Sequence, residues 1–104
     1  MAIQYADNNN FENLIQEGFV IVDFFSATCV PCKVFSRVLE ELESEIPFVD
    51  IVKVNTTDYP EIGQKNKIQA FPTIQFYKDG DVKYQHVGVM NVEQVKEQIA
   101  KLMY

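Results

Sequence analysis

The feature that most constrains the fold of this chain is a cysteine pair, Cys29 and Cys32, placed between two segments with different hydrophobic patterns. Residues 19–25 are apolar apart from Asp23 and rich in β-branched and aromatic side chains, which is typical of a buried strand. The segment after the cysteines has apolar residues at spacings of three, four and seven, which predicts one buried face of a helix: Phe35, Val38, Leu39, Leu42 and Ile46. The cysteines are therefore expected in a strand-to-helix turn.

A thiol in that turn lies at a helix N-terminus, where unpaired backbone N–H groups and the helix dipole favour an anion. Because the thiolate is the reactive form of cysteine, this position predicts thiol chemistry. Three other interpretations stay open. A structural crosslink over so short a loop would contribute only about 2 kcal/mol. A zinc site would lack two of its four ligands, since the one histidine, His86, lies elsewhere in the chain. The pair could also be two ordinary buried cysteines.

The length of 104 residues predicts a single domain, residues 1–104. The composition, 47% hydrophobic and 23% charged, is in the globular range. A formal charge of −6 argues against nucleic acid or an anionic membrane as a partner. The first residues show no basic segment followed by an apolar stretch, so we expect a cytoplasmic protein, most simply a monomer. In a reducing compartment a Cys-x-x-Cys pair is more often catalytic or metal-binding than structural.

The remaining pattern predicts alternating strands and helices in the order β-α-β-α-β-α-β-β-α. A cap pair, Asn9 with Glu12, predicts the start of the first helix, and Asp58 with an early proline predicts the start of the third. Pro47 is expected to end the helix that follows the cysteines. The dipeptide Asp79-Gly80 predicts a tight hairpin turn. The expected strands are residues 3–6, 19–25, 48–54, 73–78 and 81–87, and the other helices are residues 8–16, 58–66 and a last one opened by Asn91.

Four separated segments together resemble the thioredoxin family: residues 22–33, Lys53, residues 70–73 and residues 87–89. The resemblance covers essentially the whole chain. It implies an α/β thioredoxin fold, with a mixed five-stranded sheet flanked by four helices. The implied strand order across the sheet is residues 3–6, 48–54, 19–25, 73–78 and 81–87, with the last two strands antiparallel.

The resemblance also implies catalytic roles. Cys29 would attack a client disulfide, Cys32 would resolve the mixed disulfide, Asp23 would accept the proton of Cys32, and Lys53 would modulate Asp23. From the residues alone, a carboxylate in a buried strand costs free energy unless it is paired or protonated. Asp23 could instead be a structural acid paired with a lysine or facing solvent. Lys53 could equally form a plain salt bridge or extend its ammonium to solvent.

A substrate-binding surface around Cys29 is implied as well. Few X-Pro bonds are cis in folded proteins, so the sequence alone does not predict a cis bond at Pro72, but the resemblance does. Gly88 is expected to allow close approach of another backbone. Packing in the core or on an ordinary surface explains several of these residues equally well. The implied surface consists of Thr28, Val30, Pro31, Phe71, Pro72, Val87, Gly88 and Val89.

The implied function is a protein disulfide reductase that needs no metal and no cofactor beyond the Cys29–Cys32 disulfide. Its partners would be disulfide-containing client proteins and a thioredoxin reductase-type electron donor, in electron transport and cell redox homeostasis. Thr28, Val30 and Phe25 stand where the family usually has tryptophan, glycine and tryptophan. These changes alter the surface that partners contact. Two alternatives stay open: a more oxidising disulfide oxidase or isomerase, and a binding module in which the cysteines are dispensable.

Overall fold

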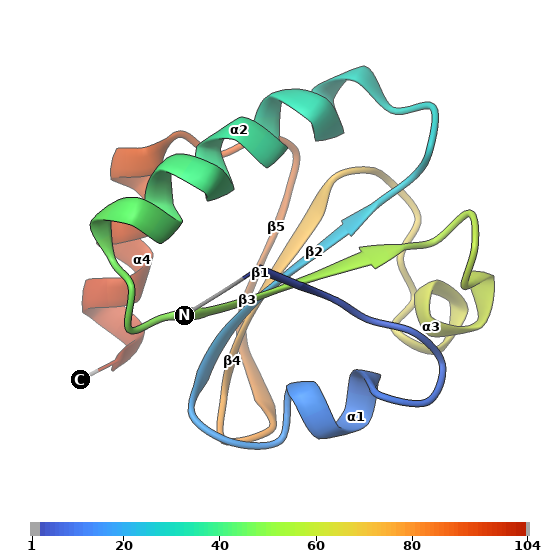
Figure 1. The fold of residues 1–104 in the computed structure, drawn as a ribbon, viewed down its shortest axis with the longest axis horizontal. Helices are drawn as coiled ribbons and strands as arrows, with labels where there is room; N and C mark the ends of the chain where they lie inside the picture. Colours follow the sequence, from blue (N-terminus) through green and yellow to red (C-terminus); the bar gives the residue numbers. More distant parts are fainter. Residues whose placement is uncertain (1–2, 104) are drawn as a thin grey trace.

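The computed structural model describes residues 3–103, which form one five-stranded sheet and four helices (Figure 1). The strand order is β1-β3-β2-β4-β5, in agreement with the predicted thioredoxin fold. β3 pairs parallel with β1 and β2, whereas β4 pairs antiparallel with β2 and β5. The predicted domain also includes Met1, Ala2 and Tyr104, which lie outside the described residues. The elements are β1 (Ile3–Tyr5), α1 (Phe11–Leu14), β2 (Phe19–Phe25), α2 (Val30–Glu45), β3 (Asp50–Asn55), α3 (Pro60–Lys65), β4 (Thr73–Lys78), β5 (Asp81–Val87) and α4 (Val92–Met103).

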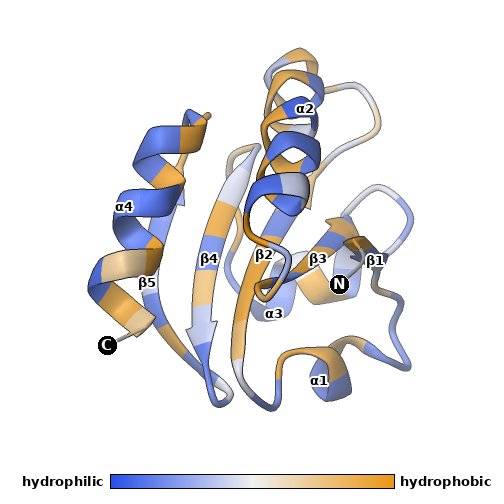
Figure 2. Ribbon diagram, turned by 60° about the vertical axis from the view of Figure 1, so that its left-hand side comes forward, coloured by the Kyte–Doolittle hydropathy of each residue, from blue (hydrophilic) through white to orange (hydrophobic). Residues whose placement is uncertain are grey.

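The sheet is covered by helices on both faces (Figure 1). Successive side chains of a strand point to opposite faces, so β2 contributes Ile21 to one core cluster and Val22 and Phe24 to the other. The first cluster includes Phe35 and Leu39 of α2 and residues of α4, and the second includes residues of α1 and α3. Figure 2 shows β2 as mainly hydrophobic and the edge strand β5 as mainly hydrophilic. Within residues 3–103, no helix is long and apolar enough to span a bilayer.

Local sequence signals fix three boundaries where they were predicted: the hairpin turn between β4 and β5, the end of α2 and the start of α4. Asp79 and Gly80 both have positive φ, 50° and 89°, as a primed hairpin turn requires. Ile46 leaves the helical conformation directly before Pro47, which ends α2. At the start of α4, the Gln94 N–H donates to Asn91 Oδ1 (2.8 Å) and the Asn91 N–H donates to Gln94 Oε1 (2.9 Å). This reciprocal cap fixes where the last helix begins.

Three local predictions are wrong. The first helix is only Phe11–Leu14, with Asn10 as its N-cap, and Asn9 lies before it in a turn where Asp7 Oδ1 accepts the N–H groups of Asn9 and Asn10 (both 2.8 Å). β3 starts at Asp50, and Phe48, predicted to lie in this buried strand, is 67% exposed. The N-cap of α3 is Tyr59 and not Asp58, whose own N–H is directed to the side chain of Asn55.

Candidate active site

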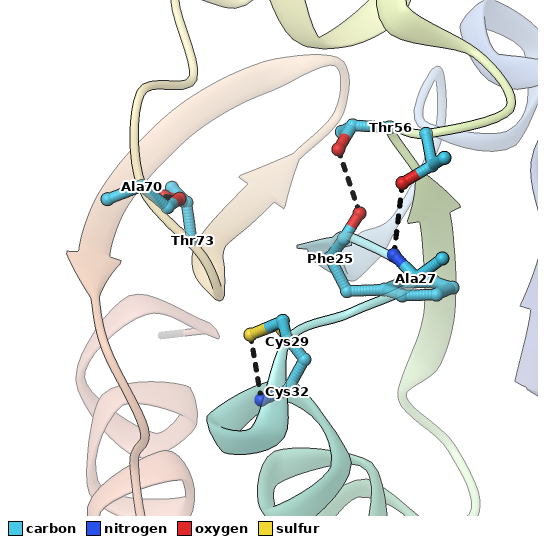
Figure 3. Close-up of a disulfide and its surroundings, with 8 residues drawn as sticks. Phe25, Ala27, Cys29, Cys32, Thr56, Ala70 and Thr73 are labelled. Atoms are coloured by element: carbon cyan, nitrogen blue, oxygen red, sulfur yellow. Dashed lines mark hydrogen bonds between the residues drawn. A yellow bond between two sulfur atoms is a disulfide. The ribbon is translucent and has the colours of Figure 1, made fainter.

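The two cysteines are joined by a disulfide at the N-terminus of α2, with 5.3 Å between their Cα atoms. Cys29 is the N-cap residue, with extended backbone, and Cys32 lies in the first turn. The Cys32 N–H donates a hydrogen bond to Cys29 Sγ (3.1 Å), as Figure 3 shows. Pro31 fits the first turn because an N–H at this position would have no partner within the helix. Cys29 is partly exposed and Cys32 is buried (4% exposed), so Cys29 is the more accessible of the two to a partner.

Two threonines after β3 hold the loop that carries Cys29. The Thr56 hydroxyl donates to the Phe25 carbonyl (2.9 Å), and the Ala27 N–H donates to Thr57 Oγ1 (3.0 Å) (Figure 3). The Thr56 N–H donates to the same carbonyl of Phe25 (2.8 Å). Neither threonine belongs to a motif or pattern that stands out in the sequence. They could have been expected near the cysteine loop because β2 and β3 are parallel, so the residues that follow the two strands lie at the same edge of the sheet.

Three segments meet at the end of the sheet from which Cys29 emerges. Thr73 pairs with Phe24 at the end of β2 and with Val87 at the end of β5. The Phe71–Pro72 peptide bond is cis, as the resemblance implies. The Pro72 carbonyl accepts the Gly88 N–H (2.8 Å). The register therefore brings the segments around Pro72 and Gly88 to the same end of the sheet as the cysteine loop.

The explanation predicted for Gly88 is wrong. A Cβ atom built on this glycine would meet no heavy atom within 4 Å, so no neighbouring backbone requires its small size. Its φ is +102°, a conformation that residues with a side chain rarely adopt. Glycine is therefore needed at this position for its backbone conformation.

The predicted substrate-binding residues differ in exposure. Val30 (68%), Val87 (57%) and Val89 are exposed apolar side chains, as are Tyr5, Phe48 and Val82 elsewhere on the molecule. Thr28 and Pro31 are also exposed, Phe71 and Gly88 are partly buried, and Pro72 is buried. Their role in binding stays a prediction.

Asp23 is fully buried (0% exposed), and neither of its oxygens has a hydrogen-bond partner among the described residues. Burial raises the pKa of this carboxyl from its ordinary 3.8 to about 7, while the positive charge of Lys53 acts in the opposite direction. Of the two alternatives, facing solvent is excluded by this burial, and a direct bond to a lysine is absent. The carboxyl can therefore gain or lose a proton near neutral pH.

Lys53 is the register partner of Asp23 on the neighbouring strand and is also buried. Its ammonium donates to the Ser36 hydroxyl (2.6 Å) and lies 5.1 Å from the ring centroid of Phe25 and 5.5 Å from that of Tyr5. The salt bridges found in the described part of the chain do not include Lys53, so the plain salt bridge considered for it is absent. Ser36 was not among the predicted site residues, although its position four residues after Cys32 places it one helical turn away.

A small open pocket of about 130 Å³ connects these groups, because Cys29, Cys32, Ser36 and Lys53 all line it. The pocket thus joins an accessible sulfur, its buried partner and a buried cation. Among residues 3–103, no three His, Cys, Asp or Glu side chains are placed to hold a metal ion. The chemistry that this arrangement offers is thiol–disulfide exchange at Cys29 with a titratable carboxyl inside the protein.

Comparisons with known proteins agree with this geometry. The family model described as thioredoxin matches residues 2–101. The chain is 33% identical over 99 residues to a thioredoxin of Chlamydia trachomatis, covering 95% of this chain and 97% of that protein. It is 35% identical over 102 residues to the thioredoxin of Bacillus subtilis, covering 97% and 98%. Thioredoxin-1 of Saccharomyces cerevisiae is 31% identical over 101 residues, covering 96% and 97%.

Proposed function

Because the chain belongs to the thioredoxin family and is a protein disulfide oxidoreductase, we propose that it reduces disulfide bonds of client proteins through Cys29 and Cys32. The observation that carries this proposal is the unequal placement of the two sulfurs. Cys29 is accessible at the mouth of α2, whereas Cys32 is buried behind it and already at bonding distance. Cys29 can therefore react with a client disulfide, and Cys32 can then react with Cys29 and release the client.

In the first step the reduced protein attacks with Cys29. The Cys32 N–H that now donates to Cys29 Sγ, together with the N-terminal end of the α2 dipole, favours the negative charge of a thiolate there. The thiolate forms a bond to one client sulfur, the client disulfide breaks, and the second client sulfur leaves as a thiolate. The product is a mixed disulfide between Cys29 and the client.

In the second step Cys32 resolves the mixed disulfide. Its thiol proton passes to the carboxylate of Asp23, and the resulting thiolate attacks Sγ of Cys29. The Cys29–client bond breaks, and the client sulfur leaves as a second thiolate. Two electrons have then moved to the client, and the Cys29–Cys32 disulfide seen in the structure has formed. A carboxyl whose pKa is about 7 is a far stronger base for this proton than one at 3.8.

The cycle requires an electron donor, and we assign that role to a thioredoxin reductase-type enzyme. The electrons are carried on the two cysteines, so the proposal needs no metal and no further cofactor. Such a carrier works in electron transport and cell redox homeostasis, and a reducing cytoplasm is its natural location because structural disulfides rarely persist there. The exposed apolar side chains of Val30, Val87 and Val89 would contact the client next to the cysteine pair.

A trapping experiment tests the assignment of the two cysteines. Cys32→Ser should accumulate a mixed disulfide between Cys29 and a disulfide-containing protein such as insulin, detectable by mass spectrometry of the adduct. Cys29→Ser is the matched control and should trap much less, because its remaining thiol is buried. Equal trapping by both variants, or trapping that requires Cys32, would contradict the proposal.

A second measurement separates the reductase from an oxidase or isomerase. The dithiol–disulfide equilibrium is measured in glutathione buffers of defined ratio. A reductase stays oxidised down to lower potentials than an oxidase, because its disulfide is the more stable of the two. A potential in the range of the disulfide-forming enzymes would contradict the reductase assignment and favour the oxidising alternative.

A further inference from the structure

The buried ammonium of Lys53 is held by a group on the active-site helix. Ser36 lies in α2, one turn after Cys32, and its hydroxyl accepts the Lys53 N–H at 2.6 Å. The faces of Phe25 and Tyr5, both within 6 Å of the ammonium, give further favourable contacts to the cation. The ammonium therefore has three partners that are not carboxylates.

Asp23 lies beside Lys53 in the sheet and yet receives no hydrogen bond from it. The two residues are register partners on parallel strands, so their side chains leave the same face of the sheet. Neither Asp23 oxygen is bonded within the described residues. A direct contact would stabilise the carboxylate strongly, because an opposite charge within about 4–6 Å lowers a carboxyl pKa by about 1–3 units. Burial is the main cause of the raised pKa of Asp23, and the position of the ammonium determines how far that pKa is lowered again.

We propose that Ser36 is a positioning residue for the proton transfer: its hydroxyl holds the Lys53 ammonium in the pocket and out of contact with Asp23, which keeps the carboxyl free to accept the proton of Cys32. The inference rests on the proposed function, and it adds a residue outside the cysteine motif to that mechanism. Without the Ser36 hydroxyl, the buried ammonium loses its shortest contact, and the adjacent carboxylate becomes its best remaining partner.

The other ionisable groups around Asp23 come from each neighbouring element. Lys33 of α2 lines the pocket that contains Lys53, as does Cys32, which has an ionisable thiol only in the reduced protein. In the sheet, Tyr5 of β1 lies beyond Lys53, and His86 of β5 lies beyond Ile74 in the same row. Of these groups, only Lys53 both adjoins Asp23 in the register and carries a buried charge. The variants therefore target Lys53 and the residue that holds it.

The test is a titration of the Asp23 carboxyl by ¹³C NMR in the oxidised protein. Ser36→Ala should lower the titration midpoint by about one pH unit as Lys53 moves to the carboxylate. Ser36→Thr keeps the hydroxyl and should stay near the wild-type midpoint. Lys53→Met removes the cation and should raise the midpoint, and Ser36→Ala should then have no further effect. Ser44→Ala, an exposed serine of the same helix, is the matched control and should change nothing.

An unchanged midpoint in Ser36→Ala, or the same decrease in the absence of Lys53, would overturn the inference. The titration uses the oxidised protein, so it is independent of the trapping experiment that tests the proposed function. The pH profile of insulin reduction is measured in parallel. In Ser36→Ala its acidic limb should move to lower pH and its plateau should fall. A lowered midpoint with an unchanged profile would show that Asp23 is not the proton acceptor and would also overturn the inference.

Discussion

Replacing Asp23 by asparagine should stabilise the oxidised protein in a strongly pH-dependent way. The carboxyl is fully buried without a bonded partner, so its charged form is disfavoured in the folded state. Asparagine has nearly the same shape and is always neutral, and it therefore imitates the protonated aspartic acid. The variant separates the cost of the buried charge from the cost of burying the side chain.

The magnitude follows from the pKa difference between the two states. The carboxyl titrates at about 7 in the folded protein, against an ordinary value of 3.8 that applies to the unfolded chain. Between these values the unfolded state has lost the proton and the folded state keeps it, so stability falls as the pH rises. The difference of about three pH units, at about 1.4 kcal/mol each, corresponds to about 4 kcal/mol. Asp23→Asn should thus match the wild type below pH 4 and exceed it by about 4 kcal/mol above pH 7.

The assay is urea unfolding of the oxidised proteins at several pH values from 4 to 9, followed by far-ultraviolet circular dichroism. Asp50→Asn, at an exposed position of β3, is the matched control and should follow the wild type at every pH. A gain in Asp23→Asn that is equally large at pH 4 and pH 8 would refute the reasoning, because it would come from packing and not from charge. No gain at pH 8 would refute it as well.

Other predictions concern the backbone, a helix cap and the binding surface. Gly88→Ala should lower the free energy of unfolding by about 1–2 kcal/mol in urea, because alanine disfavours a φ of +102° although its Cβ would meet nothing. Asn91→Ala should lower it by about 1 kcal/mol, since the Gln94 N–H loses its cap, and an unchanged urea midpoint would exclude that role. Val30→Ser combined with Val87→Ser should slow insulin reduction about tenfold, or about 1.4 kcal/mol, while reduction of a small aromatic disulfide stays the same. Equal slowing with both substrates would count against a protein-binding surface.

The elements that the sequence predicts well have either a pattern set by burial over many residues, as β2 and α2 do, or a clear turn signal beside them, as the exposed strand β5 does. β2 was predicted at its observed bounds because nearly all of it is buried, and α2 was predicted from an apolar stripe that repeats over about three turns and ends before Pro47. The predictions failed where one local contact decides the structure. Asp7 Oδ1 accepts the N–H groups of Asn9 and Asn10 in a turn, and the first helix begins only after this turn, at Phe11. Phe48 continues an apolar run in the sequence, yet the chain turns outward there before β3 begins.

The residues of the active site likewise fall into those that the sequence indicates and those that only the structure reveals. Cys29, Cys32 and Asp23 each stand out within their own segment, as a motif or as a residue that disagrees with its surroundings, whereas Pro72 was named only through the resemblance. Ser36 and Thr57 do not stand out, since a serine on a helix and a threonine in a loop are ordinary. Their importance arises from hydrogen bonds to residues 17 and 30 positions away, which only the folded structure brings together.

Burial of the Asp23 carboxyl lowers the stability of the folded protein, and the same burial raises its pKa into the range that suits its proposed chemistry. A thiol has an ordinary pKa near 8.5, so a carboxylate at 3.8 would be a poor acceptor for its proton, whereas one at about 7 is close to matched. A direct bond to Lys53 would stabilise the folded protein but would return the carboxyl toward its ordinary pKa. Stability would therefore be served by an Asp23 carboxylate bonded to Lys53, whereas proton transfer requires that carboxylate to be free. By accepting the hydrogen bond of Lys53, Ser36 favours proton transfer. Asp23→Asn should accordingly raise the free energy of unfolding at pH 8 and slow the resolution of the mixed disulfide in the same molecule.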